Sequence, residues 1–274
     1  MNMGKLYVVG TPIGNLGDMS PRAVEVLGQC DFIAAEDTRV SLKLLNHFGI
    51  KKPMISYYEH NLRQRGEEII ARILAGEDCA VITDAGMPCI SDPGEDLVKL
   101  CAEENIPIEV VPGPSAVISA LAVSGLSTSR FTFEGFLSVK RASRHEHLLQ
   151  IKDDPRTLIF YEAPHKLVAT LKDLLEVLGD RKISLCRELT KLHEQVRRTT
   201  LREGLGYYQE NPPKGEFVLV IEGAPDKKEP ELSLEEAAQM VKMLCEGGTS
   251  LSEAAKEIAG QTGYKKGQLY KMCL

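Results

Sequence analysis

The segment from Thr83 to Gly94 constrains this chain more than any other. It follows the apolar run 80–82 and carries glycines at positions 86 and 94 and prolines at positions 88 and 93. Glycine permits backbone conformations that are closed to other residues, and proline fixes φ, so neither a strand nor a helix continues here. Such a loop lets main-chain groups approach a small molecule, which favours a ligand loop over an ordinary surface turn.

Two other loops have the same character. Residues 10–18 follow the apolar run 6–9, and residues 112–116 follow the run 108–111. In a parallel α/β sheet, all strand-to-helix turns of this kind emerge at one edge. The three loops are therefore expected to meet in one crevice, where small-molecule sites of such sheets lie.

The order of apolar runs predicts an α/β protein. Residues 5–124 give five strand-then-helix units, which indicates a parallel sheet, with strands near 5–9, 31–35, 53–57, 79–83 and 107–111. Further strand-like runs and an amphipathic helix at 166–178 predict a second, mixed sheet. We expect an N-terminal lobe at 1–125, a C-terminal lobe at 126–224, and a linker with a small helical extension at 225–274.

The extension contains three expected helices, at 233–245, 250–259 and 265–272, after a charged linker at 224–232. The trio has the size of a helix-turn-helix, but a small helical bundle is the commoner outcome. Its basic cluster is limited to Lys265, Lys266 and Lys271, so nucleic-acid contact there is the lesser hypothesis.

Charge and cysteine usage exclude several classes of protein. The net charge of −6 argues against indiscriminate nucleic-acid binding, which needs many phosphate contacts. The seven cysteines lie far apart, without the paired spacing of zinc or iron–sulfur ligands, so no metal site is expected. No apolar run reaches membrane-spanning length, and the N-terminus carries no leader-like pattern, so we expect a cytoplasmic protein.

A dinucleotide site is not supported. Gly10, Gly14 and Gly17 lie between a strand and a helix, and an acidic pair ends the next strand. A dinucleotide fingerprint needs glycine where this chain has Pro12, which has no N–H donor. No GxxxxGKS phosphate loop is present either. The ligand is therefore expected to be small and poor in phosphate.

Ordered sequence blocks over residues 5–223 resemble one known family. They are 6–16, 36–39, 60–61, 84–86, 91–94, 112–116, 161–165, 187–191 and 215–218. Together they resemble the ribosomal RNA small subunit methyltransferase I family, of the tetrapyrrole methylase superfamily. The resemblance implies two α/β lobes that bind S-adenosyl-L-methionine between them, and a homodimer. It also implies methylation of the ribose 2′-hydroxyl of a decoding-centre cytidine in small-subunit (16S) rRNA, within the ribosomal subunit.

The resemblance also implies the residues of the cofactor site. Glycine and proline backbones would contact adenine and ribose, and the helix that follows Ser115 would present its N-terminal amides to the cofactor carboxylate. The expected cofactor-binding residues are Pro12, Ile13, Gly14, Asp84, Ala85, Gly86, Met87, Ser115, Ala116, Tyr161, Glu162, Glu188 and Leu189.

For the chemistry, Glu36, Asp37, Arg39, His60 and Asn61 are the expected polar rim that receives the ribose. The acidic residues and His60 are candidates for accepting the hydroxyl proton, and Arg39 could bind a flanking phosphate. The competing interpretation is a local ion network at a strand end, with His60 capping the following helix. Proton uptake by solvent also stays open, so no base is assigned.

RNA must reach this site despite the acidic total charge. Residues 181–202 contain seven lysines and arginines against two acidic residues, which indicates a phosphate-contact face or, alternatively, a solvated sheet surface with scattered charge.

Two other functions stay open. The chain could methylate a tetrapyrrole or a diphthamide precursor, or it could be a noncatalytic RNA-binding assembly factor.

Overall fold

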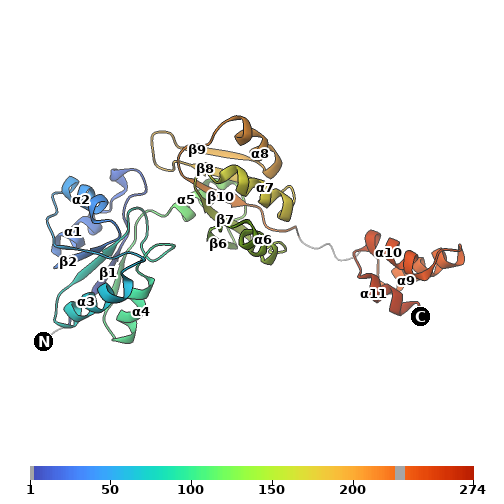
Figure 1. Ribbon diagram of the computed structural model, residues 1–274, viewed down its shortest axis with the longest axis horizontal. Coiled ribbons are helices and arrows are strands. Elements are labelled where there is room, and N and C mark those ends of the chain that lie inside the picture. The colour runs from blue at the N-terminus through green and yellow to red at the C-terminus, as the bar shows by residue number, and fades with distance from the viewer. Residues whose placement is uncertain (1–2, 226–231) are drawn as a thin grey trace. The chain divides into compact units, whose positions relative to one another are not determined.

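The computed structural model describes residues 3–225 and 232–274 (Figure 1). The chain groups into two compact units, Met1–Ala224 and Pro225–Leu274. The first unit contains two five-stranded sheets and the second contains helices. The α/β class expected from the sequence is confirmed, while most of the expected linker at 224–232 lies outside the described residues.

The first sheet is fully parallel, with strand order β3-β2-β4-β1-β5. Its strands are almost continuously apolar because helices cover both faces. Helices α1 and α2 pack on one face and α3 and α4 on the other. The elements are β1 Leu6–Val9, η1 Leu16–Asp18, α1 Pro21–Gln29, β2 Phe32–Ala35, α2 Thr38–His47, β3 Met54–Ser56, α3 Leu62–Leu74, β4 Cys79–Ile82, α4 Glu95–Glu103 and β5 Ile108–Val111.

Local signals in the sequence fix the ends of these helices. The Ser20 hydroxyl accepts a hydrogen bond from the Ala23 amide, at 3.1 Å, and Pro21 takes the first helical position of α1. Asp37 caps α2 in the same way, through the Arg39 amide at 2.8 Å. These caps place the preceding strand-to-helix loops at the carboxyl edge of the sheet.

The second sheet is mixed, as expected, with order β6-β7-β10-β8-β9. Only β6 and β7 are parallel, and the remaining neighbours are antiparallel. Helix α5 covers one face, and α6, α7 and α8 cover the other. The elements are α5 Ala116–Ser124, β6 Phe131–Phe136, α6 Arg141–Gln150, β7 Thr157–Glu162, α7 Leu167–Leu178, β8 Lys182–Arg187, β9 Gln195–Thr200, α8 Leu201–Glu210 and β10 Phe217–Ile221.

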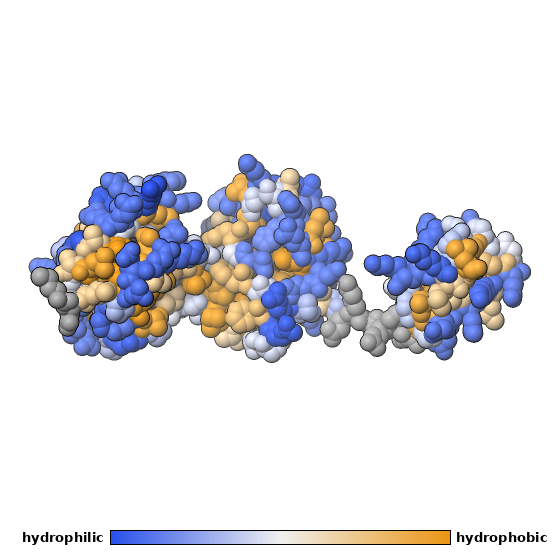
Figure 2. All heavy atoms as spheres, turned by 90° about the horizontal axis from the view of Figure 1, so that it is seen from below, coloured by the Kyte–Doolittle hydropathy of each residue, from blue (hydrophilic) through white to orange (hydrophobic). Residues whose placement is uncertain are grey.

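The second unit is a three-helix bundle made of α9 Leu234–Glu246, α10 Leu251–Thr262 and α11 Lys266–Met272. Alanines at 237, 254 and 255 let the helices approach closely around Ile258 and Leu269. A capping box between Ser233 and Glu236 starts α9. On the face of each unit that Figure 2 shows, apolar patches are scattered among hydrophilic side chains. Within the described residues, no helix is long and apolar enough to cross a membrane.

Candidate active site

The loops that follow the strands of both sheets in the first unit surround a cavity of about 580 Å³. This volume lies within the range of small-molecule sites. Apolar side chains, among them Ile13, Met87, Ile90 and Phe136, form much of the lining, and carboxylates are concentrated at the ends of β2 and β4. The cavity can therefore hold a ligand that has both an apolar body and charged groups.

Most residues predicted to bind the cofactor line this cavity. Pro12 and Gly14 flank Ile13 but do not belong to the lining. The predicted residues in the lining are Ile13, Asp84, Ala85, Gly86, Met87, Ser115, Ala116, Tyr161, Glu162, Glu188 and Leu189. Their contacts with a cofactor stay predictions.

The loops after β1, β4 and β5 hold each other by their backbones. Thr11 and Gly86 exchange two main-chain hydrogen bonds, of 2.9 and 3.1 Å, and Gly86 has a φ of 91° that favours glycine. A Cβ atom on Gly10 would lie 2.7 Å from the Cα atom of Gly113, so these two loops touch only because both positions lack side chains. The glycines thus let these loops pack together beside the cavity, and Gly86 belongs to its lining.

Three carboxylates face the cavity without a cationic partner. Glu36 accepts hydrogen bonds from the Thr83 hydroxyl, at 2.6 Å, and from the Asp84 amide, at 3.4 Å. Burial and, next, the Glu36 charge raise the pKa of Asp84. Burial, followed by Glu36, raises the pKa of Asp92 to about 6. Within the described part of the chain none of the three forms an ion pair, so a cationic ligand such as a sulfonium or an ammonium group fits the site.

The loop that carries Asp92 is held in an unusual backbone conformation. Cys89, Ser91 and Gly94 have φ values of 70°, 61° and 129°. Two of these residues are not glycine, and strained positions of this kind are concentrated at functional sites. The sequence motif at 91–94 lies in this loop, but no role for Asp92 is predicted from the sequence.

The residues of the predicted polar rim do not line one cavity. Glu36 lines the main cavity, while Asp37 and Arg39 form a salt bridge of 2.7 Å beside it. Hydrogen bonding to Arg39 lowers the pKa of Asp37 to about 2. His60 and Asn61 line a second cavity beside the start of α3. The local ion pair therefore exists, and Asn61, rather than His60, takes the N-cap position of α3.

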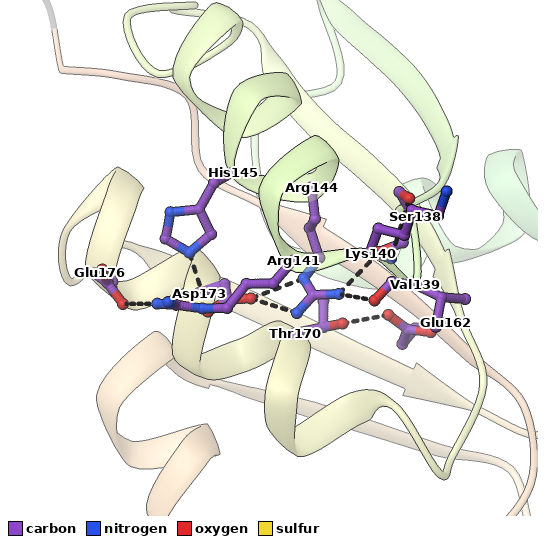
Figure 3. A network of polar contacts seen from close by, with 10 residues as sticks. All are labelled: Ser138, Val139, Lys140, Arg141, Arg144, His145, Glu162, Thr170, Asp173 and Glu176. Carbon is purple, nitrogen blue, oxygen red and sulfur yellow. Dashed lines mark hydrogen bonds and ion pairs between the residues drawn. The ribbon is translucent and has the colours of Figure 1, made fainter.

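The second sheet supplies an aromatic and polar wall. The Tyr161 ring lies 4.9 Å from that of Phe133 and 5.3 Å from that of Phe136, between ring centroids. Glu162 is buried, and one of its oxygens accepts from the Ala163 amide, at 2.8 Å. The other oxygen accepts from the Thr170 hydroxyl, at 2.5 Å, and Figure 3 shows this bond. Both Glu162 oxygens are thus engaged within the protein, which makes this residue a support of the wall.

A network on α6 and α7 fixes the loop after β6 (Figure 3). The Arg144 guanidinium donates to buried Asp173, at 2.8 and 2.5 Å, and to the carbonyls of Ser138 and Val139, at 2.8 and 3.2 Å. This loop follows Phe136, which lines the cavity. The network therefore holds one side of the cavity from outside.

The same network contains a group with the composition of a metal site. His145 and Glu176 lie near Asp173, and the His145 Nε2 atom is 3.1 Å from an Asp173 oxygen without the geometry of a hydrogen bond. Arg141 and Arg144 already supply positive charge to Asp173. A metal cation would have to compete with two guanidiniums, so the group is an ion-pair network.

Several residues that line the cavity are not among the site residues predicted from the sequence. They are Ile90, Asp92, Phe136, Ala163, Pro164, His165, Cys186, Lys191, Glu216, Phe217 and Val218. Among them, Lys191 bridges Glu188, at 2.9 Å, and Glu216, at 3.0 Å. The resemblance blocks at 161–165, 187–191 and 215–218 contain many of these residues and could have located them, and the segment 83–94 contains Ile90 and Asp92.

Comparison with known proteins places the chain among methylases. The family model described as Tetrapyrrole (Corrin/Porphyrin) Methylases matches residues 5–204. A protein of Synechocystis sp. named "Ribosomal RNA small subunit methyltransferase I" is 50% identical over 273 residues, which cover 99% of this chain and 98% of that protein.

Two further comparisons each cover about four fifths of this chain. A Thermotoga maritima protein of the same name is 46% identical over 221 residues, covering 81% of this chain and 99% of its own length. About a fifth of this chain thus has no counterpart in it. The crystal structure of uroporphyrin-III-C-methyltransferase from Thermus thermophilus has a TM-score of 0.54 at 22% identity and covers 79% of this chain and 94% of that one. This last likeness concerns the fold alone.

Proposed function

Because the chain belongs to the tetrapyrrole methylase family and, within it, to the ribosomal RNA small subunit methyltransferase I family, we propose that it methylates the ribose 2′-hydroxyl of a decoding-centre cytidine in small-subunit (16S) rRNA. The chain is a methyltransferase that uses S-adenosylmethionine. The similarity to relatives of that name along nearly the whole chain is the observation that carries the rRNA substrate. A cytoplasmic location follows from this substrate.

The cavity suits the cofactor by its chemistry. The cofactor supplies an electrophilic methyl group on a sulfonium. Glu36, Asp84 and Asp92 would face its positive charges, and the apolar lining around Ile13 and Met87 would hold its adenine. The backbone amides at the start of α5 would take its carboxylate. These roles extend the residue assignments made from the resemblance.

Methyl transfer to a hydroxyl leaves this chain two tasks. It must hold the acceptor oxygen in line with the methyl group, and it must receive one proton. Positioning can supply about 7–11 kcal/mol, which exceeds the usual contribution of a single general base. Asp92 suits the second task, because a carboxyl with a pKa of about 6 is ionised at neutral pH yet holds a proton more tightly than an ordinary aspartate.

A homodimer is part of the proposal, and an uncovered apolar surface supports it. Strand β5 is an edge strand, and Ile108 and Val110 on it are exposed. Ile118 and Val123 on α5 are exposed as well. Exposed apolar side chains on an edge strand and on a helix are typical of interaction surfaces when they form one patch. Sedimentation velocity of the full chain distinguishes a dimer from a monomer.

The substrate is tested with tritium-labelled S-adenosylmethionine. Assembled small ribosomal subunits, free small-subunit rRNA and a tetrapyrrole are supplied in parallel, and the label is mapped by the resistance of a 2′-O-methyl linkage to nuclease. We expect label at one cytidine of the small-subunit rRNA. Label on the tetrapyrrole alone, or on a base, overturns the assignment. Cofactor binding without any label would favour a noncatalytic assembly factor.

A further inference from the structure

The basic segment 181–202 contains two arginines that the fold leaves without a charged partner. Five of its seven cations are engaged within the protein. Three form ion pairs, namely Lys182 with Glu222, Lys191 with Glu188 and Glu216, and Arg202 with Asp180. Two donate to main-chain carbonyls, namely Arg181 to Lys152, Leu178 and Glu222, and Arg198 to Val123 and Ser124. Arg187 and Arg197 form no ion pair within the described residues. Their Nε atoms are buried and lack a hydrogen-bond partner.

Strand register brings these arginines to one face of the second sheet. Arg187 on β8 is directly opposite Gln195 on β9, and Arg197 lies two residues further along β9. Such diagonal neighbours are about 7–8 Å apart between their backbones, within reach of long side chains. On its other side, Arg187 is opposite Phe217 of β10. The ring of Tyr208 contacts Phe217, at 5.5 Å between centroids.

Tyr208 adds a third unpaired donor. Its side chain is 95% buried, since only 5% is exposed, and its hydroxyl has no hydrogen-bond partner of normal geometry. Burial raises the pKa of Tyr208, while the charges of Arg197 and Arg187 and a close side-chain contact from Arg197 oppose that rise, so both guanidiniums lie near the hydroxyl. The Arg197 guanidinium also stacks on the Tyr207 ring, 3.6 Å from its centroid, which holds it in place.

No carboxylate in the described part of the chain forms an ion pair with Arg187 or Arg197, although the Arg187 charge is one of the smaller causes that lower the pKa of Glu188. Glu188, next to Arg187 in the chain, is bound by Lys191 at 2.9 Å. The remaining contact of the Arg187 guanidinium is a long hydrogen bond of 3.4 Å to the Lys214 carbonyl. Buried donors are normally satisfied, so converging donors that lack a partner point to a ligand that supplies acceptor oxygens.

We propose that Arg187, Arg197 and Tyr208 form a binding site for a phosphodiester of the RNA backbone. Guanidiniums match phosphate oxygens in geometry and charge, and a tyrosine hydroxyl can donate a further hydrogen bond. The site lies on the sheet face opposite to Cys186, and it is linked to the cavity through Phe217, which is opposite Arg187 on β10 and belongs to the cavity lining. This inference rests on the proposed rRNA substrate.

The test compares Arg187→Gln, Arg197→Gln and Tyr208→Phe with Arg202→Gln. Arg202 belongs to the same basic segment but pairs with Asp180, so its variant is the matched control. Filter binding measures the affinity for small-subunit rRNA over a salt series, independently of methyl transfer. Calorimetry measures S-adenosylmethionine affinity, and thermal melting measures folding.

Each arginine variant should weaken rRNA binding about tenfold and reduce the salt slope by about one, since one phosphate contact contributes about 0.9 to that slope. Tyr208→Phe should weaken binding less, with the slope unchanged. Cofactor affinity should be preserved in all four variants, and the control should bind like the wild type. Wild-type affinity and slope in both arginine variants overturns the proposal.

Binding of inorganic phosphate distinguishes a site for the RNA backbone from a site for a free phosphate ion. If it binds at micromolar concentration in an Arg187-dependent way while rRNA affinity ignores the variants, the site serves a free anion and the RNA assignment is wrong. Because rRNA binding is measured directly, a failure of the methylation assay alone refutes the proposed function without deciding this site.

Discussion

Asp92 should make the folded chain less stable at neutral pH, and replacing it with asparagine should remove that cost. Burial and two neighbouring carboxylates raise its pKa from 3.8 to about 6. The folded protein therefore retains a proton that the unfolded chain releases between these two pH values. Stability falls as the pH rises through this window and stays lower above it.

The magnitude follows from the shift. About two pKa units correspond to about 3 kcal/mol, at about 1.4 kcal/mol per unit. Asp92 is only half-buried, so solvent screening reduces this to about 1–2 kcal/mol. Asp92→Asn should gain that amount at pH 7.5, which corresponds to a rise of about 3–6 °C in melting temperature. The gain should shrink towards zero at pH 4, where Asp92 in the folded protein is protonated and therefore as neutral as asparagine.

The assay is thermal melting of the cofactor-free protein at several pH values between 4 and 7.5, with Asp173→Asn as a control of opposite sign. Burial opposes the shift, but hydrogen bonds from Arg144 and Arg141, together with the contact of the His145 ring, lower the pKa of Asp173. That variant should therefore lose stability most at neutral pH and less in acid. An Asp92→Asn gain that is equal at all pH values, or a loss at pH 7.5, refutes the electrostatic argument.

Three further predictions concern the cavity and its supports. Gly86→Ala should weaken S-adenosylmethionine binding at least tenfold by calorimetry, because hydrogen bonds to Thr11 fix the φ of residue 86 at 91°. Gly179→Ala is the control, because Gly179 has a φ of 80° with open space around it, so this variant should affect stability alone. Arg144→Met should cost about 3–5 kcal/mol in urea unfolding, because it strips a buried carboxylate of its main partner, and a loss below 1 kcal/mol would contradict this. A chain ending at residue 224 should melt cooperatively and bind cofactor like the full chain, and aggregation of that chain would count against an independent first unit.

The elements with strong periodic signals could be predicted from the sequence. The strands of the parallel sheet are apolar on both faces, so their positions were found to within a residue or two. Strand β9 and helices α6 and α8 were missed. The sequence of β9, Gln-Val-Arg-Arg-Thr-Thr, is polar because this strand lies at the edge of its sheet, and no alternation of apolar residues marks it.

The cavity could be predicted in outline for a related reason. Loops after parallel strands converge whatever their side chains are, so Ile13, Asp84 and Ser115 were expected together and do line one cavity. His60 and Asn61 line a different cavity, because the position of a residue after the short strand β3 depends on the path of the loop before α3. The sequence neighbourhood of a polar residue does not determine that path.

The arginines of segment 181–202 show where prediction from sequence reaches its limit. Arg187, Arg197 and Arg202 look alike in the sequence, and only their tertiary partners distinguish them. Asp180 pairs with Arg202 because β9 leads directly into α8, beside the turn that precedes β8. Arg187 and Arg197 instead lie on a face where Tyr208 and Phe217 supply aromatic surface, and neither arginine forms an ion pair with another described residue. A count of basic residues therefore overstates the phosphate-binding surface, and the unpaired donors are the better measure of where a polyanion binds.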